Sequence, residues 1–166
     1  MYCFFCDTVH CHDIERLLME QMDCIAFSPR IVQRKWVKGK CTEEVRDFLP
    51  GYVFLYTQQP VVEFQSIYRT SGIIRLLGDR EAGYCLAGED KQFAEMLYAY
   101  QGVIGILKAY TVGDRIRLAA EPLSGYEGEV IKVDRRKGRA QIRICFDKKE
   151  MKIWAGFDLI DKISEQ

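Results

Sequence analysis

The sequence predicts an α+β protein in two parts, a mixed α/β sandwich followed by a small β-barrel. Two helix-spaced apolar patterns and a continuous apolar strand fall within the first hundred residues. After about Leu107 the pattern changes to short strands separated by glycine-rich or charged turns. This change of period predicts one domain over residues 1–105 and a second over residues 110–166, joined near Gly102 and Gly105.

The first domain opens with a strand, a helix and a second strand. Residues 2–6 are an apolar and aromatic run, which is typical of a buried strand. Helical spacing follows in the positions of Ile14, Leu17, Leu18 and Met22. Residues 24–27 predict another strand, which Ser28-Pro29 ends.

The middle of the first domain predicts two more strands and two helices. Residues 31–37 read as a strand that ends in the turn 38–40, and residues 52–56 read as a central strand. We expect a short helix over 61–68 and a brief strand over 83–85. The strongest helix places apolar residues at i, i+3, i+4 and i+7, namely Phe93, Met96, Leu97 and Tyr100.

The second domain predicts strands alone. These cover residues 115–119, 129–133, 140–146 and 151–154. In the third strand Ile142, Ile144 and Phe146 alternate with polar or small residues, which predicts one buried and one wet face.

Composition limits the classes of protein to consider. The chain is 48% apolar and 29% charged, with no apolar stretch of membrane-spanning length and no secretory signal pattern at its start. We therefore expect a cytoplasmic protein, and its seven cysteines, an odd number, favour reduced thiols. Residues 1–107 hold 11 basic and 14 acidic residues (−3), and residues 108–166 hold 13 and 10 (+3), so positive charge favours the second domain.

Two motifs, in this order, resemble the NusG family of transcription factors. Residues 48–54 read Phe-Leu-Pro-Gly-Tyr-Val-Phe, which is similar to the Phe-Pro-Gly-Tyr-Val strand of the family's NGN domain. Residues 112–117 and 125–134, with Gly113, Gly125 and Gly128, resemble a KOW motif. The resemblance continues to residues 157–160 and implies an NGN-type α/β sandwich followed by an SH3-like KOW barrel.

Two departures from the family pattern indicate a specialised paralogue of the RfaH or LoaP type. The start Met-Tyr-Cys-Phe-Phe at residues 1–5 replaces the usual Trp-Tyr-Val-Val, and Glu-Pro-Leu at residues 121–123 replaces Gly-Pro-Phe.

The resemblance also implies a surface for RNA polymerase. The NGN domain of this family binds the clamp region of the largest polymerase subunit, and the matching positions here are Tyr52 and Phe54. The alternative is that both rings belong to the core. A turn at Arg69, Thr70 and Ser71 occupies the place from which NGN domains reach the other side of the polymerase cleft, although a plain helix-ending turn would read the same.

Two basic clusters are candidates for contact with nascent RNA or non-template DNA, because Lys and Arg neutralise phosphates. The first surrounds Trp36 and comprises Arg30, Arg34, Lys35, Lys38 and Lys40. The second surrounds Gly138 and comprises Lys132, Arg135, Arg136, Lys137 and Arg139. For each cluster the alternative is an ordinary solvated hairpin.

The cysteines and histidines near the start of the chain are the candidates for metal binding or catalysis. Cys3, Cys6, His10, Cys11, His12 and Cys24 contain soft ligands for zinc, but Cys3 and Cys6 would face opposite sides of a strand. The chain has neither a phosphate-binding glycine-rich loop with Lys nor a nucleophile with a facing base. We expect no enzyme activity, no cofactor and no metal.

Composition and spacing by themselves indicate only a soluble, two-domain, non-enzymatic binding protein. The resemblance implies a monomeric elongation and antitermination factor that binds RNA polymerase. Its KOW domain would recruit RNA or a protein partner such as a ribosomal protein or a termination factor. The alternative is a ribosome- or RNA-binding KOW module without polymerase contact, and no membrane association is expected.

Overall fold

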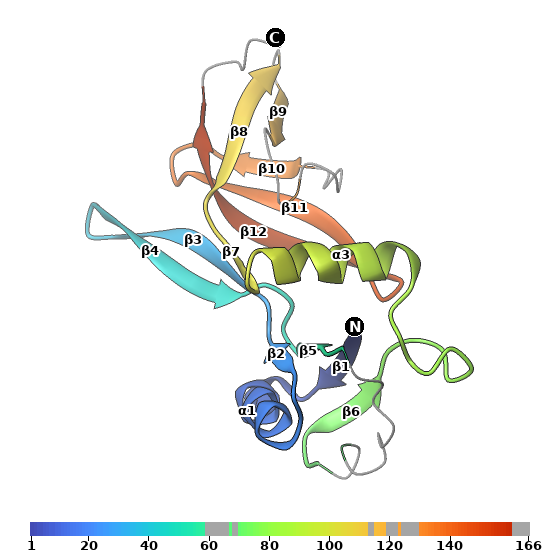
Figure 1. Cartoon of the computed structure of the whole chain (residues 1–166). Coiled ribbons are helices and arrows are strands. Elements are labelled where there is room, and N and C mark those ends of the chain that lie inside the picture. The colour runs from blue at the N-terminus through green and yellow to red at the C-terminus, as the bar shows by residue number, and fades with distance from the viewer. Residues whose placement is uncertain (59–66, 68–69, 113–114, 119–122, 124–129, 161–166) are drawn as a thin grey trace. The chain divides into compact units, whose positions relative to one another are not determined.

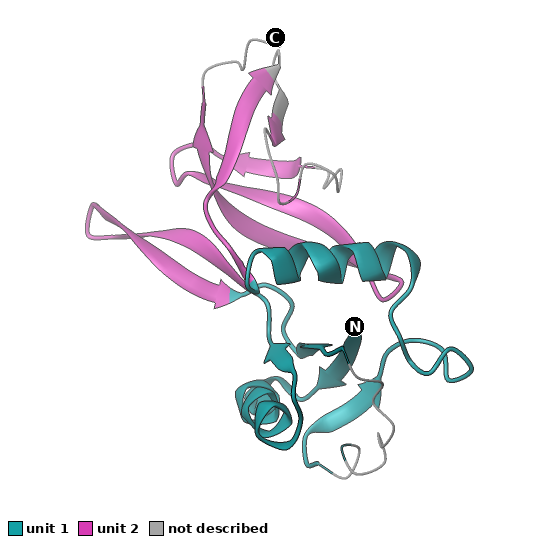
Figure 2. Ribbon diagram, viewed as in Figure 1, with its two compact units in different colours: residues 1–29, 47–102 teal, residues 30–46, 103–166 magenta. Residues whose placement is uncertain are grey.

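The computed structural model describes residues 1–58, 67, 70–112, 115–118, 123 and 130–160 (Figure 1). The chain forms two compact units (Figure 2). Unit 1 comprises residues 1–29 and 47–102, and unit 2 comprises residues 30–46 and 103–166.

Unit 1 is built on a four-stranded antiparallel sheet with the order β2-β5-β1-β6. Its strands are β1 (Tyr2–Cys6), β2 (Ile25–Phe27), β5 (Tyr52–Tyr56) and β6 (Ile73–Leu76). Strand β5 pairs with β1 on one side and β2 on the other. Both faces of β5 are also covered, since the consecutive residues Tyr52, Val53, Phe54 and Leu55 are all buried, which explains why its sequence is apolar without alternation.

Helix α1 (Cys11–Gln21) covers one face of this sheet, after a 3₁₀ turn η1 (Thr8–His10). Its buried Ile14 and Leu18 share a core with Phe4, Val53 and Leu55. These sheet residues lie on one face because Phe4 pairs with Val53 and side chains alternate along each strand.

The other face carries aromatic rings and meets helix α3 (Gly88–Ala99). Phe27 and Phe54 stack at 5.8 Å between ring centroids, and Phe5 and Tyr52 lie 5.0 Å apart. Helix α3 joins this layer through Phe93, which contacts Phe48, and through Tyr98, which stacks on Tyr56 at 4.0 Å. The helices α1 and α3 thus lie on opposite sides of the sheet (Figure 1), which makes unit 1 an α/β sandwich.

The turn that leads into β5 requires a glycine at position 51. Gly51 has φ of +87°, and a Cβ there would lie 2.9 Å from the carbonyl oxygen of Cys6. The amide of Cys6 donates a hydrogen bond to the carbonyl oxygen of Gly51, which fixes this turn against the end of β1. Any side chain at position 51 would therefore separate the two segments.

Unit 2 contains two sheets. A three-stranded sheet has the order β4-β3-β7 and is formed by β3 (Arg30–Val37), β4 (Lys40–Asp47) and β7 (Val103–Ile104). A five-stranded sheet has the order β10-β11-β12-β8-β9. Its strands are β8 (Leu107–Val112), β9 (Arg115–Leu118), β10 (Val130–Asp134), β11 (Arg139–Phe146) and β12 (Lys149–Leu159).

Most predicted elements are confirmed. The strands at residues 2–6, 24–27, 31–37 and 52–56, the helix around Ile14 and Leu18, and the helix around Phe93 and Leu97 all form. Ala140, Ile142, Ile144 and Phe146 are buried, so the alternation in β11 is also confirmed. The mixture of few helices and many strands agrees with an α+β fold.

Other predictions were wrong or incomplete. Residues 83–85 are a turn rather than a strand, because Tyr84 has φ of +61° and its amide bonds the carbonyl oxygen of Asp79. Strands β4, β6, β7 and β8 were not predicted, and β4 is polar because it is largely exposed. The predicted helix over 61–68 lies outside the described residues apart from Ile67.

The compact units divide the chain differently from the predicted domains. Residues 30–46 group with the carboxy-terminal strands, because β3 pairs in parallel with β7 and contacts β12. The division at 102/103 lies close to the predicted joint, and Gly102 has φ of +73° there. The domain limits 1–105 and 110–166 stay a prediction.

We expect Phe54→Ala to destabilise unit 1 strongly. The side chain of Phe54 is fully buried, and truncation of such a ring typically costs about 3–5 kcal/mol of unfolding free energy. Urea unfolding followed by far-UV circular dichroism measures this, because α1 and α3 both lie in unit 1. Ile74→Ala is the control, since Ile74 is 58% exposed on β6 and should change stability by less than about 0.5 kcal/mol. Equal midpoints for the two variants would contradict the packing described.

Candidate nucleic-acid interface

The first basic cluster lies on the β3–β4 hairpin of unit 2. A two-residue turn joins the strands, and both of its residues have positive φ, +49° at Lys38 and +79° at Gly39. This is the conformation of a type I′ hairpin turn, whose twist matches that of the paired strands and which favours glycine. Four basic residues of this cluster are exposed, namely Arg30, Lys35, Lys38 and Lys40.

The second basic cluster lies at the turn between β10 and β11. Asp134 pairs with Arg139 across the ladder, which leaves residues 135–138 as the loop. The side chain of Asp134 accepts a hydrogen bond from the amide of Lys137 at 3.1 Å. The amide of Gly138 donates to the carbonyl oxygen of Arg135, and Gly138 takes φ of +60°. The side chains of Arg135, Arg136 and Lys137 in this loop are exposed.

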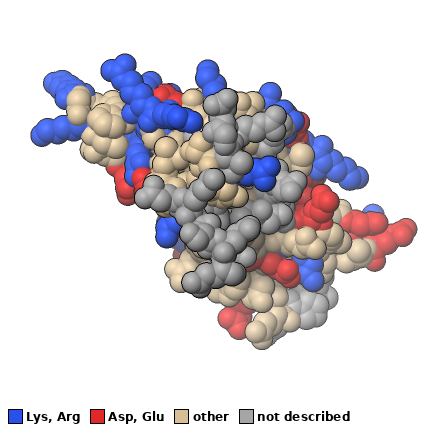
Figure 3. Space-filling model, turned by 90° about the horizontal axis from the view of Figure 1, so that it is seen from above, with Lys and Arg blue, Asp and Glu red and all other residues tan. Residues whose placement is uncertain are grey.

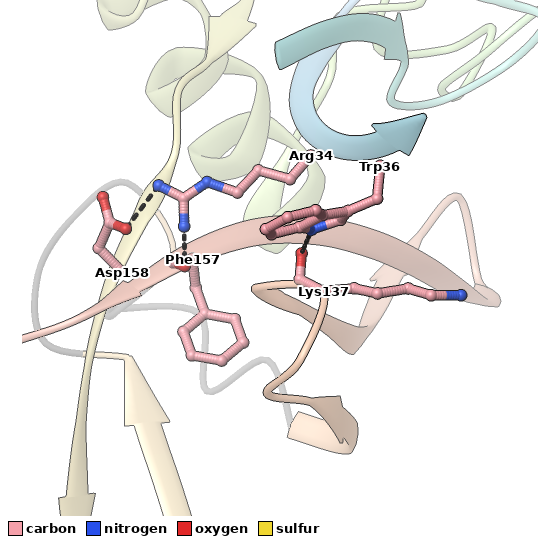
Figure 4. Close-up of polar contacts among 5 residues, drawn as sticks. All are labelled: Arg34, Trp36, Lys137, Phe157 and Asp158. Carbon is pink, nitrogen blue, oxygen red and sulfur yellow. Dashed lines mark hydrogen bonds and ion pairs between the residues drawn. The ribbon is translucent and has the colours of Figure 1, made fainter. Parts of the chain in front are cut away.

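The structure brings these two clusters together within unit 2. The indole nitrogen Nε1 of Trp36, on β3, donates a hydrogen bond to the carbonyl oxygen of Lys137 at 3.4 Å (Figure 4). The guanidinium of Arg34 donates to the carbonyl oxygen of Phe157 at 3.0 Å and forms an ion pair with Asp158 at 2.5 Å. Segments about 100 residues apart in sequence therefore form one surface.

Strand β3 lies against β12 at close range. The amide nitrogen Nε2 of Gln33 donates to the carbonyl oxygen of Trp154 at 2.5 Å. A Cβ at Gly156, on β12, would lie 2.5 Å from the side chain of Ile106 and 3.2 Å from the carbonyl oxygen of Val32. Gly156 thus permits an approach of β3 that no other residue type would allow without displacement.

The joined surface carries an excess of positive charge. Residues 30–46 contain six Lys and Arg residues and two Glu residues. Glu44 pairs with Lys35 at 3.7 Å and with Arg46 at 2.8 Å. In contrast, no described carboxylate forms an ion pair with Lys38, Lys40, Arg135 or Arg136. Figure 3 shows blue side chains gathered at the end of this face where the hairpin lies.

The predicted nucleic-acid residues fall into two groups. Arg34 and Arg139 are half-buried and are occupied by protein contacts. Arg139 pairs with Asp134 at 3.4 Å, and its guanidinium lies 4.6 Å from the centroid of the Trp154 ring. The remaining members have exposed side chains, namely Arg30, Lys35, Lys38, Lys40, Lys132, Arg135, Arg136 and Lys137.

The predicted polymerase-binding residues lie in unit 1 and are placed differently. Tyr52 is 3% exposed and Phe54 is fully buried, which is the placement that a core role requires. At the second position Ser71 is exposed, Thr70 is half-buried, and Arg69 lies outside the described residues. The turn at 70–72 is held against β1 by a 2.7 Å hydrogen bond from the amide of Asp7 to the carbonyl oxygen of Gly72.

The amino-terminal cysteines are buried thiols. Burial, with a smaller effect of nearby Cys11, raises the pKa of Cys6 to about 12. Burial also raises the pKa values of Cys11 and Cys24. Among the described residues, no three or more His, Cys, Asp or Glu side chains are grouped closely enough to hold a metal ion.

The described chain is thus an α+β protein in which most of the exposed basic side chains lie on unit 2. The family model of NusG, described as transcription termination factor nusG, matches residues 2–110, which is more than half of the chain. The chain belongs to the NusG family, a family of transcription factors. No curated protein matches it. None of the described helices is both long and apolar enough to span a membrane.

Three residues of the interface were not predicted to have a role. Gln33 and Gly156 give no local signal, because their importance comes from a strand more than a hundred positions away in sequence. Asp158 falls within the family-like segment 157–160, but only the structure shows its pairing with Arg34. Trp36 carries a usable signal, since an aromatic residue among basic residues on a strand suggests an exposed ring.

We expect thiol labelling to separate the seven cysteines. Cys41, Cys85 and Cys145 are exposed and should react quickly with a thiol reagent, because the reagent can reach them in the folded protein. The buried Cys3, Cys6 and Cys11 should react only after unfolding, because they are inaccessible and, for Cys6 and Cys11, burial raises the thiol pKa. Mass spectrometry of peptides after brief labelling identifies the sites. Fast modification of Cys6 would contradict the described core, and labelling in urea is the control.

Proposed function

We propose that this protein is a transcription elongation factor that binds RNA polymerase in the cytoplasm and promotes processive elongation and antitermination. The observation that carries the proposal is the NusG family match over residues 2–110. The matched span includes nearly all of unit 1, together with the basic hairpin and strand β7 of unit 2.

In this proposal unit 1 provides the contact with the clamp region of the largest polymerase subunit. Tyr52 and Phe54 lie on the family-like strand β5. In the second proposed contact Ser71 is exposed and Thr70 is half-buried, and Arg69, just before them in sequence, lies outside the described residues. Because both rings are buried, they would contact polymerase directly only if the segment covering them moved. Without such movement they support the surface from beneath.

The carboxy-terminal part of unit 2 would act as a KOW domain of the SH3-like type, as in a specialised paralogue similar to RfaH or LoaP. Its five-stranded sheet and its buried β11 side chains support this assignment. The motif glycines at 113, 125 and 128 lie outside the described residues. The exposed basic residues of unit 2 would contact nascent RNA or non-template DNA, and the same domain would recruit a ribosomal protein or a termination factor.

One observation favours the alternative, a ribosome- or RNA-binding module without polymerase contact. The exposed Lys and Arg residues of both clusters lie on unit 2, whereas the proposed polymerase-binding rings of unit 1 are buried. A protein that used only unit 2 would show this distribution.

The first test is binding and transcription with core RNA polymerase from the organism that encodes the chain. We expect the full-length protein to co-purify with polymerase, to shorten pauses and to increase readthrough at a terminator in single-round transcription. A folded protein that binds ribosomes or RNA but leaves polymerase binding and pausing unchanged would establish the alternative.

A second test separates polymerase contact from core packing at position 52. Tyr52→Leu keeps an apolar side chain in β5 and should retain the fold at assay temperature, as checked by circular dichroism. If the ring contacts polymerase, affinity should fall about tenfold or more, as for an interface aromatic. Ser71→Ala in the exposed turn is the matched probe of the second contact, with little effect on stability expected. Unchanged affinity in folded Tyr52→Leu would assign the ring to the core.

A further inference from the structure

We propose that the β3–β4 hairpin and the β10–β11 turn form one binding site for single-stranded nucleic acid, with Trp36 as the platform on which a base stacks. This inference deepens the proposed nucleic-acid contact of unit 2 and does not depend on polymerase binding. It replaces two independent basic clusters with one site that exists only while β3 lies against β12.

The geometry of Trp36 gives the first argument. Its indole edge is fixed by the hydrogen bond to the carbonyl oxygen of Lys137, while the side chain as a whole remains 48% exposed. Stacking on a free side chain costs conformational entropy, because the ring must be held in one orientation. The ring of Trp36 is already held by its edge, so a base that stacks on it loses less of this entropy. Bases of a single strand stack on such rings, whereas the bases of a duplex are already stacked on each other.

The charges around the ring give the second argument. Lys38 and Lys40 lie at the hairpin tip that follows Trp36, and Arg135 and Arg136 lie in the loop that bonds its indole. No described carboxylate neutralises these four side chains. Positive groups in the two segments next to an aromatic platform match the alternating phosphates and bases of one strand.

The contacts that join the two parts give the third argument. The guanidinium of Arg34 forms an ion pair with Asp158 and donates a hydrogen bond to the carbonyl oxygen of Phe157 (Figure 4). Its charge is therefore directed to protein groups rather than to solvent. A Cβ at Gly138 would lie 2.9 Å from the Arg34 guanidinium, and a Cβ at Gly156 would meet Val32 and Ile106. These contacts hold the hairpin beside the loop, so Arg34 is a positioning residue and not a phosphate ligand.

Two variants, each with a matched control, distinguish a composite site from simple charge attraction. Gly156→Val should wedge β3 away from β12 without changing any charge, because its side chain would occupy the space of Val32 and Ile106. Gly105→Val is the matched control in unit 2, since a Cβ at Gly105 meets nothing within 4 Å. Asp158→Lys removes the partner of Arg34 and adds positive charge. Its control is Glu150→Lys, which makes the same charge change on strand β12 at a residue that pairs with Arg143.

The experiment measures binding of the full chain to a labelled oligouridine of about 12 nucleotides by fluorescence anisotropy, with oligothymidine and a duplex of equal length as comparisons. We expect the wild type to prefer either single strand over the duplex. Gly156→Val and Asp158→Lys should each weaken binding about tenfold. If charge alone governed binding, Gly156→Val would leave the affinity unchanged and Asp158→Lys would increase it. Gly105→Val should bind as the wild type does, and Glu150→Lys at least as tightly.

Two further variants test the ring and the phosphate contacts. Trp36→Ala should weaken binding about tenfold with the salt dependence unchanged, because base stacking involves no phosphate. Lys38→Ala with Lys40→Ala should lower the slope of log affinity against log salt by about 1.4 between about 50 and 200 mM salt, since each lost phosphate contact on a single strand contributes about 0.7.

The outcomes test separately whether unit 2 binds nucleic acid and whether the hairpin and the loop form one site. If the folded wild type binds no oligonucleotide, both the proposed nucleic-acid contact and the composite site are wrong. If the wild type binds but folded Gly156→Val and Asp158→Lys bind equally well or better, only the composite site is wrong. A preference for duplex would overturn the stacking role of Trp36. Circular dichroism checks the fold of each variant, and Asp158→Lys, a surface change, serves if Gly156→Val does not fold.

Discussion

The close approach of strand β3 to strand β12 is the contact on which the arrangement of unit 2 depends. Gly156 lies at this contact, where a Cβ would be 3.2 Å from the carbonyl oxygen of Val32 and 2.5 Å from the Cδ1 methyl of Ile106. Around this contact, Gln33 bonds the backbone of Trp154, and Arg34 bonds Phe157 and Asp158. Without this contact the basic hairpin would be an isolated exposed hairpin. Trp36 would then lose its hydrogen bond to the carbonyl oxygen of Lys137 in the β10–β11 loop.

Unit 1 is organised by a different constraint, the double burial of strand β5. Its residues face helix α1 on one side and an aromatic layer on the other, so the strand is apolar throughout. This burial limits how function can be assigned, because a buried aromatic residue in a family-like motif has a structural reason to be there. Function in unit 1 must be sought at exposed positions such as Ser71, or in a movement that uncovers β5.

The two units also differ in their chemistry. The amino-terminal cysteines of unit 1 resemble a set of zinc ligands in sequence, yet Cys3, Cys6 and Cys11 are buried, and burial raises the pKa values of Cys6 and Cys11. Most of the exposed positive charge lies on unit 2 instead, including that of the hairpin and the β10–β11 loop. Membership of the NusG family connects the chain to transcription.

The sequence by itself determined the local features of this protein. Apolar spacing identified helices α1 and α3 and the alternation of β11, because these patterns depend only on the period of one element. It also identified both basic clusters, because charge is a property of composition. Only the tertiary structure decided that Arg34 is a structural contact, that Trp36 bonds the second cluster, and that Tyr52 and Phe54 are buried. Each of these depends on which distant segment lies beside a residue, and no local pattern encodes that neighbour.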